Sequence, residues 1–274
     1  MSKARERLKT VREELGIHAK RSLGQNFLVS DHVIEKIVNA GAGFQPTTII
    51  EVGPGCGALT WELKEVCERL QLIELDHELA EYWRGKNFDV IETDALKWSW
   101  DLAEFPGRKV FVSNLPYQIS SSILVERSID KVPLSGMVLM FQKEVAQRIK
   151  AKVGAEDYGF LSVLAQTFWD VELLLEAGPR DFDPAPRIAS RVLTFNPRQV
   201  QVADRPKYLK FLKACFLHPR KIMISSLMEG LGRPREELTA ALEKRGLDPK
   251  IRAGELRLQQ FLDLYRELGM EQNS

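Results

Sequence analysis

The motif Asn114-Leu115-Pro116-Tyr117 contains residues that could hold the exocyclic amine of a nucleobase during an alkylation. The Asn114 side-chain oxygen and the Leu115 carbonyl can each accept one amine hydrogen, which favours the more tetrahedral nitrogen that such a reaction needs. Pro116 fixes the turn through its restricted φ angle. Tyr117 offers a flat face on which an extruded base can stack. We therefore predict these four residues as the catalytic site, against the alternative of an ordinary turn.

A second motif, a glycine-rich turn, could bind a nucleotide-like cofactor. The apolar run at residues 49–52 continues into Gly53, Gly55 and Gly57, and a helix follows. Glycines let the backbone approach a ligand closely, and ligands of parallel sheets lie beyond the carboxyl ends of the strands. Ala58 replaces the last glycine of the nicotinamide-binding pattern, which disfavours a dehydrogenase. The alternative is a tight turn without a ligand. The predicted cofactor contacts here are Glu51, Gly53 and Gly55.

Acidic residues end the next two predicted strands and could contact the same cofactor. Glu74 ends the second strand, 21 residues after Gly53, where a carboxylate can accept hydrogen bonds from both ribose hydroxyls. Asp76 is less favoured because it can cap the following helix. Asp94 ends the third strand, where it could accept the amine of an adenine or, alternatively, cap a turn. We predict Glu74 and Asp94 as cofactor contacts.

The elements that position these motifs are short apolar strands that alternate with amphipathic helices, which predicts a mostly parallel sheet covered on both faces. A helix begins near Asp31, which we expect to cap it. The strands are expected at residues 48–52, 70–75, 89–92, 109–113 and 136–141, and further helices through 59–63, from 77, over 119–129 and over 143–150. Runs at 171–176 and 191–195 predict an antiparallel addition at the sheet edge.

The pattern changes beyond Pro197 to four helical segments punctuated by glycine and proline. These segments cover residues 207–217, 221–231, 234–245 and 254–268. The predicted fold class is α/β, with a Rossmann-like sheet followed by a small all-helical domain. We place the domain boundary near residue 200, with domains at residues 1–200 and 201–274.

The composition excludes several classes of protein. With 44% hydrophobic and 28% charged residues, the chain is neither disordered nor collagen-like nor a coiled coil. The longest apolar stretch, residues 132–141, is far shorter than the roughly 20 residues of a membrane span, and the charged N-terminus has no apolar signal region. Three cysteines and four histidines lack the spacing of disulfide or zinc sites, so we expect no metal and a cytoplasmic location.

The charge is unevenly distributed, although the net charge is only +1. Residues 1–22 carry +4 and residues 187–257 carry +9, whereas residues 23–186 carry −10. This asymmetry is typical of a protein that binds a polyanion through one basic face, although solvated helix faces would give the same pattern.

The ordered set of motifs resembles the KsgA-type ribosomal RNA adenine dimethyltransferases, which are related to the Erm methyltransferases. The resemblance covers nearly the whole chain. It rests on the glycine-rich turn and the Asn114 motif, and also on the segments at residues 20–28, 142–145, 158–163, 182–186, 248–249 and 252–253. It implies a Rossmann-like methyltransferase sheet with S-adenosylmethionine as cofactor.

By this resemblance, the substrate is a pair of adjacent adenines near the 3′ end of small-subunit ribosomal RNA, each receiving two methyl groups. The implied partner is the immature small ribosomal subunit, and we expect a monomer without membrane attachment. Asn26 and Leu28 are similar to residues that close over the cofactor, and Asn114 would border both cofactor and amine. The expected phosphate contacts, which make RNA affinity fall steeply with salt, are Lys20, Arg21, Arg220, Lys221 and Arg252.

Three positions depart from the family pattern. Gln118 replaces a frequent asparagine, Ala189 a frequent aspartate, and Pro219 interrupts the basic helix of the small domain. Three alternatives stay open: an Erm-like enzyme acting on large-subunit RNA, a non-catalytic nucleic-acid binder of the same fold, and a nicotinamide-dependent dehydrogenase.

Overall fold

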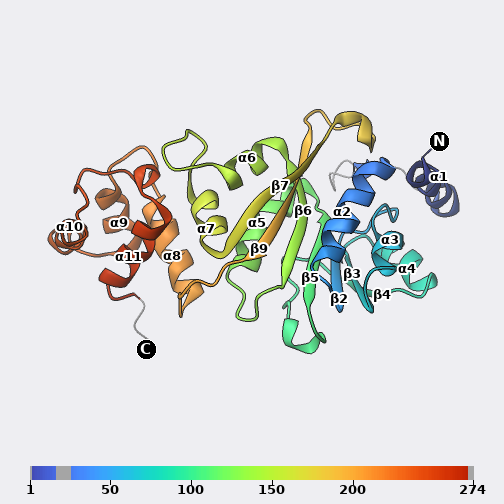
Figure 1. Ribbon diagram of the computed structural model, residues 1–274, viewed down its shortest axis with the longest axis horizontal. Coiled ribbons are helices and arrows are strands. Elements are labelled where there is room, and N and C mark those ends of the chain that lie inside the picture. Colours follow the sequence, from blue (N-terminus) through green and yellow to red (C-terminus); the bar gives the residue numbers. More distant parts are fainter. Residues whose placement is uncertain (1, 17–25, 271–274) are drawn as a thin grey trace. The chain divides into compact units, whose positions relative to one another are not determined.

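The protein forms two compact units in the computed structural model, which describes residues 2–16 and 26–270 (Figure 1). The first unit comprises the residues up to 124, 132–146 and 170–197, and the second comprises 125–131, 147–169 and those from 198 onward. The division into domains at residues 1–200 and 201–274 stays a prediction. No helix among the described residues is long and apolar enough to cross a bilayer.

A seven-stranded sheet lies in the described part of the chain, in the order β4-β3-β2-β5-β6-β9-β7. Its strands are β2 (Thr48–Val52), β3 (Arg69–Glu74), β4 (Asp89–Glu92), β5 (Lys109–Asn114), β6 (Gly136–Gln142), β7 (Trp169–Ala177) and β9 (Ser190–Pro197). The pairs β2–β3, β3–β4, β2–β5 and β5–β6 are parallel, and β9 is antiparallel to β6. The predicted mostly parallel sheet with an antiparallel addition is therefore confirmed.

Helices flank the sheet, and α2 lies across β5 and β6 (Figure 1). The α-helices are α1 (Lys3–Leu15), α2 (Asp31–Gly43), α3 (Thr60–Lys64), α4 (His77–Gly85), α5 (Tyr117–Ser128), α6 (Lys143–Lys150), α7 (Phe160–Phe168), α8 (Arg205–Cys215), α9 (Met223–Leu231), α10 (Arg235–Lys244) and α11 (Leu258–Glu267). Short 3-10 helices are η2 (Leu102–Glu104), η3 (Pro179–Asp181) and η4 (Ala253–Glu255). The helical segments expected beyond Pro197 are confirmed, and Tyr208, Phe211 and Tyr265 pack against one another among them.

Hydrophobic periodicity explains why these segments fold as they do. β2 is buried along its whole length, as a parallel strand covered on both faces must be. α2 buries Val33, Ile34, Ile37 and Val38, which share one face of the helix, against the same core. Burial of apolar surface on both sides thus fixes where β2 and its neighbours end.

Trp83 of α4 connects this core to the glycine-rich turn. It is fully buried and packs on Trp61 and Phe88, with ring centroids 5.5 and 5.1 Å away. Its indole N–H donates to the Gly55 carbonyl at 3.0 Å. A Cβ on Gly57, whose φ is 84°, would approach the Trp83 ring to 2.5 Å. The turn therefore requires glycine at this position.

Asp31 does not cap the helix that it begins, so that prediction is wrong. Ser30 is the N-cap residue of α2. The Asp31 carboxylate instead accepts hydrogen bonds from the backbone amides of Lys3 and Ala4, at 2.8 and 2.9 Å. These amides belong to the first turn of α1, where backbone donors have no partner within the helix. Asp31 therefore joins α1 to α2.

Besides the 3-10 helices η2 and η3, four elements in the described part of the chain were not predicted. They are α1, α7 and two short strands, β1 (Phe27–Leu28) and β8 (Phe182–Asp183), which pair antiparallel with each other. β1 and β8 are too short for a periodic pattern, and their pairing joins residues far apart in the chain. The helix expected from residue 221 begins at Met223, and the last expected helix is divided into η4 and α11.

Candidate active site

A cavity opens beyond the carboxyl ends of β2, β3, β4 and β5 in the first unit. All eleven predicted cofactor-binding and catalytic residues line it: Asn26, Leu28, Glu51, Gly53, Gly55, Glu74, Asp94, Asn114, Leu115, Pro116 and Tyr117. The carboxyl ends of neighbouring parallel strands meet at one edge of the sheet, which brings these distant residues together. Their individual roles stay predictions.

The glycine-rich turn forms one wall of this cavity. Gly53 and Gly55 have φ angles of 64° and 54°, in the left-handed region that favours glycine. A Cβ on Gly53 would lie 3.5 Å from the Pro116 ring, and one on Gly55 would lie 3.1 Å from the Phe27 ring. The turn is therefore enclosed between the Asn114 motif and strand β1.

Glu51 presents a buried carboxyl group to the cavity. The residue is 2% exposed, and burial raises its pKa to about 8, with a further contribution from the negative charge of Glu74. Its Oε2 atom has no hydrogen-bond partner in the structure. A polar or cationic group of a bound cofactor would satisfy this oxygen, so the cavity fits a ligand with such a group near the glycine-rich turn.

Glu74 lies at the tip of β3 with its carboxylate held in place. Its Oε1 atom accepts hydrogen bonds from the amides of Leu75 and Asp76, at 2.8 and 2.9 Å. Burial raises the pKa of Glu74, and these amide bonds oppose the rise. Asp76 caps α4 by accepting the Glu78 amide at 3.1 Å, as predicted. Glu74, unlike Asp76, lines the cavity.

Asp94 caps a turn and also lines the cavity. Its Oδ1 atom accepts the Leu96 amide at 3.0 Å, which caps the turn after β4. Its Oδ2 atom lies 3.9 Å from the Lys97 ammonium group. Because Asp94 also lines the cavity, capping the turn does not prevent a contact with a ligand.

Two hydrogen bonds hold the Asn114 motif beside the glycine-rich turn. The buried Ser113 hydroxyl donates to the Val52 carbonyl at 2.6 Å, so the tips of β5 and β2 are tied together. The Asn114 side chain donates through Nδ2 to the Asn26 carbonyl at 3.5 Å. This bond uses the nitrogen of the Asn114 side-chain amide as the donor. The side-chain oxygen, which the prediction requires as the acceptor for the substrate amine, takes no part in it.

The Tyr117 ring is held at its hydroxyl end. This hydroxyl lies 2.8 Å from the Ser190 hydroxyl, and Ser190 is fully buried at the start of β9, opposite Gln142 of β6. Burial raises the pKa of Tyr117, and the bond to Ser190 opposes the rise. Since Pro116 restricts the backbone before the ring, both ends of the Tyr117 side chain are positioned before any substrate arrives.

The cavity also contains residues that were not predicted as site residues. Further lining residues are Ala4, Leu8, Phe27, Leu75 and Ala95. Leu75 is 56% exposed, although it directly follows a buried strand. An exposed apolar side chain at a strand tip is the signal that could have identified it. Ser190 carried no such signal, because its contact with Tyr117 spans 73 positions.

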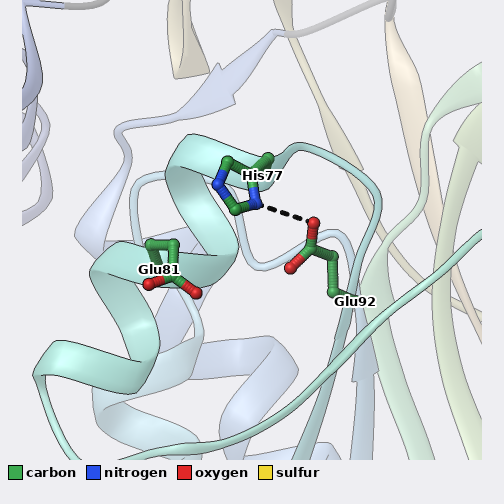
Figure 2. A group of neighbouring side chains, drawn as sticks. All are labelled: His77, Glu81 and Glu92. Atoms are coloured by element: carbon green, nitrogen blue, oxygen red, sulfur yellow. Dashed lines mark hydrogen bonds and ion pairs between the residues drawn. The ribbon is translucent and has the colours of Figure 1, made fainter.

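A charged cluster near the start of α4 has the spacing of a metal site, as Figure 2 shows. The ligand atoms of His77, Glu81 and Glu92 lie within 4.8 Å of one another, and all three residues are exposed. His77 bonds to Glu92 at 2.8 Å, which raises the pKa of the imidazole. Arg84 pairs with both glutamates. These ion pairs account for the arrangement of the cluster.

The three predicted RNA-binding residues that the structure describes do not line the cavity. Lys20 and Arg21 lie outside the described residues. Arg220, Lys221 and Arg252 belong to the second unit, where all three are exposed. Arg220 and Lys221 lie in the turn before α9, and a backbone bond from Met223 to the Ile251 carbonyl brings the segment of Arg252 beside them. The backbone segments that carry these three exposed cations are therefore neighbours in that unit.

The parallel sheet, the glycine-rich turn and the acidic strand tips define a Rossmann-like methyltransferase that uses S-adenosylmethionine. The chain belongs to the ribosomal RNA adenine dimethylase family, whose sequence model matches residues 16–269. This membership confirms the predicted enzyme class and cofactor, and it overturns the dehydrogenase and non-catalytic alternatives.

Two similar proteins are both named ribosomal RNA small subunit methyltransferase A. The one from Bdellovibrio bacteriovorus is 49% identical over 99% of this chain and 100% of its own length. The one from Desulfitobacterium hafniense is 38% identical over 90% of this chain and 91% of its own length.

Two solved structures share the fold. A dimethyladenosine transferase from Plasmodium falciparum aligns with a TM-score of 0.74 at 23% identity, covering 89% of this chain and 98% of that chain. The 23S rRNA methyltransferase ErmE aligns with a TM-score of 0.63 at 26% identity, covering 89% of this chain and 100% of that chain.

The substitution Glu51→Gln should flatten the dependence of folding stability on pH. The Glu51 carboxyl binds its proton more tightly in the folded protein, where its pKa is about 8, than in the unfolded chain, where it is near 4.5. The unfolding free energy of the cofactor-free protein therefore falls as pH rises between these values, by up to about 1.4 kcal/mol per pH unit. Glutamine removes this contribution. Urea unfolding at several pH values in that range measures the slope of unfolding free energy against pH for the wild type and for Glu51→Gln. Equal slopes would contradict the raised pKa of Glu51.

Proposed function

We propose that the protein transfers methyl groups from S-adenosylmethionine to the N6 amines of two adjacent adenosines in the 3′-terminal hairpin of small-subunit ribosomal RNA, two to each amine. The observation that carries this proposal is the shared cavity, which both the Asn114 motif and the glycine-rich turn line. The relatives named as small subunit methyltransferases, at 49% and 38% identity, support the choice of RNA.

Positioning is the main task of the protein in this reaction. S-adenosylmethionine supplies an activated methyl group whose leaving group is a neutral thioether. The Asn114 side-chain oxygen and the Leu115 carbonyl accept the two amine hydrogens and hold the nitrogen in line with that methyl group. Alignment of this kind can lower the barrier by about 7 to 11 kcal/mol. The nitrogen becomes positively charged when it takes the methyl group and can then release its proton to water, so the transfer step needs no strong general base.

The cofactor is held by groups from three strand tips and from β1. Gly53 and Gly55 approach the methionine end, beside the unpaired Glu51 oxygen. Glu74 would accept hydrogen bonds from the ribose hydroxyls, and Asp94 would accept one from the adenine amine. Asn26 and Leu28 close over the bound cofactor from the N-terminal side.

The Tyr117 ring serves as the platform for the extruded adenine. A flat face that borders the cavity can stack on the base while Asn114 holds its amine. Ser190 acts through Tyr117 as a positioning residue, because its hydroxyl fixes the far end of the ring. A ring that is already oriented loses less entropy when the base arrives.

Contacts with the RNA backbone come from the second unit and from Lys20 and Arg21. The exposed cations Arg220, Lys221 and Arg252 lie on neighbouring segments and can meet several phosphates at once. The partner is the immature small ribosomal subunit. The protein acts as a monomer without membrane attachment in the cytoplasm, and its three free thiols fit a reducing compartment.

An Erm-like activity on large-subunit RNA is the second candidate. The structural likeness to the 23S rRNA methyltransferase ErmE favours this second candidate, although the sequence identity with ErmE is only 26%. Identity of 49% over the full length of a small subunit methyltransferase favours the first candidate.

The substitutions Asn114→Ala and Glu74→Ala should separate catalysis from cofactor binding. Loss of the Asn114 acceptor should lower methyl transfer to unmodified small subunits on the order of 100-fold, while cofactor affinity stays within about threefold. Loss of the Glu74 carboxylate should raise the cofactor dissociation constant about tenfold or more. Label transfer and calorimetry measure the two effects. Undiminished turnover of Asn114→Ala, or unchanged affinity of Glu74→Ala, would refute the respective role.

The variants Tyr117→Phe and Ser190→Ala should each lower methyl transfer, and the double variant should be no worse than the poorer single one. Both remove the same hydroxyl-to-hydroxyl bond, so their effects on kcat/KM are not additive. Cofactor affinity should stay at the wild-type level in all three. Additive losses in the cycle would show that Ser190 does not act through Tyr117.

The double variant of Arg220→Ala with Lys221→Ala should weaken RNA binding and make it less dependent on salt. Each lost phosphate contact should reduce the slope of log affinity against log salt by about 1. Filter binding of the RNA hairpin at several salt concentrations measures the slope. The matched control is Arg233→Ala, whose side chain pairs with Glu237 in the same unit. A slope unchanged from wild type would exclude Arg220 and Lys221 from the interface.

A further inference from the structure

Helix α1 precedes the residues that the family model matches, and it forms part of the cavity wall. The family match begins at residue 16, and α1 ends at Leu15. Ala4 and Leu8 of this helix nevertheless line the cavity together with the glycine-rich turn. The helix buries Ala4, Leu8 and Val11, which recur on one face at helical spacing. A helix outside the residues matched by the family model therefore lines the predicted cofactor cavity.

Polar contacts dock both ends of α1 onto the first unit. At its start, the Asp31 carboxylate accepts the Lys3 and Ala4 amides, and the Ser2 hydroxyl donates to the Val29 carbonyl at 2.6 Å. Near its end, Arg12 pairs with Asp183 at 3.2 Å. Since Asp183 is opposite Phe27 in the β1–β8 pair, α1 holds the strand that covers the glycine-rich turn.

The apolar face of α1 packs against strand β1, which covers the glycine-rich turn. Leu8 and Val11 pack in one cluster with Phe27, Val29 and Cys56. Phe27 in turn lies against Gly55, and Cys56 belongs to the same turn. Leu8 therefore packs in the cluster and also lines the cavity. Val11 packs in the same cluster but does not line the cavity.

We propose that α1 is a cofactor-binding element, in which Leu8 packs against bound S-adenosylmethionine and Asp31 holds the helix in the position where it does so. The inference rests on the proposed function, because it takes S-adenosylmethionine as the occupant of the cavity. Docking of α1 and binding of the cofactor then stabilise each other, since each supplies part of the surface that the other contacts. Weaker docking must lower cofactor affinity by the same coupling.

The test compares Leu8→Ala with Val11→Ala, a matched truncation in the same cluster, by calorimetric titration with S-adenosylhomocysteine. Both variants should lower the melting temperature, because both remove buried methyl groups. Leu8→Ala should raise the dissociation constant roughly fivefold, and Val11→Ala less than about twofold. Equal changes in affinity for the two variants would show that Leu8 only stabilises the fold, and the proposal would be wrong.

A second variant keeps the proposal testable if Leu8→Ala does not fold. Asp31→Ala removes both hydrogen bonds to α1 and should raise the dissociation constant and the dissociation rate of S-adenosylhomocysteine by similar factors. A wild-type affinity for Asp31→Ala would overturn the docking role. If the wild-type protein binds S-adenosylhomocysteine but transfers no methyl group to small subunits, the proposed function fails while these affinity ratios still decide the role of α1.

Discussion

The hydrogen bond from the Ser113 hydroxyl to the Val52 carbonyl joins the two turns on which the chemistry depends. The two residues are 61 positions apart in the chain, but their strands β5 and β2 are parallel neighbours. The bond lies where β2 passes into the glycine-rich turn and β5 passes into the Asn114 motif. Because the amine and the methyl group must meet in line, the distance between these strand tips decides whether transfer can occur.

Strand order explains why the cavity lies at this point of the sheet. From β2, the chain adds β3 and β4 on one side and then crosses back to add β5 on the other side. The order in which strands are added therefore reverses between β2 and β5. The connections that leave such neighbouring strands diverge to opposite faces and leave a crevice between them. Glu74 and Asp94 reach the same crevice from the tips of β3 and β4. One topological feature thus collects the cofactor contacts and the base-holding motif.

The sequence was sufficient for features that depend on local pattern and insufficient for those that depend on tertiary contacts. The parallel sheet and nine of the eleven cavity residues follow from apolar runs and from motifs at strand tips, which are local signals, whereas Asn26 and Leu28 were predicted from the family resemblance. Asp31 was assigned to its own helix because helix caps usually act locally, whereas it binds amides 27 and 28 positions away. The Tyr117–Ser190 bond and the β1–β8 pair likewise join distant segments that carry no periodic signal.

The most direct measurement is a map of the methylated positions after purified protein and labelled S-adenosylmethionine are incubated with unmodified small and large ribosomal subunits. Mass spectrometry of the digested RNA identifies both the nucleotide and the number of methyl groups. We expect N6,N6-dimethyladenosine at two adjacent positions of the 3′-terminal hairpin of small-subunit RNA. Label confined to large-subunit RNA, or methyl groups on atoms other than an adenine N6, would contradict it.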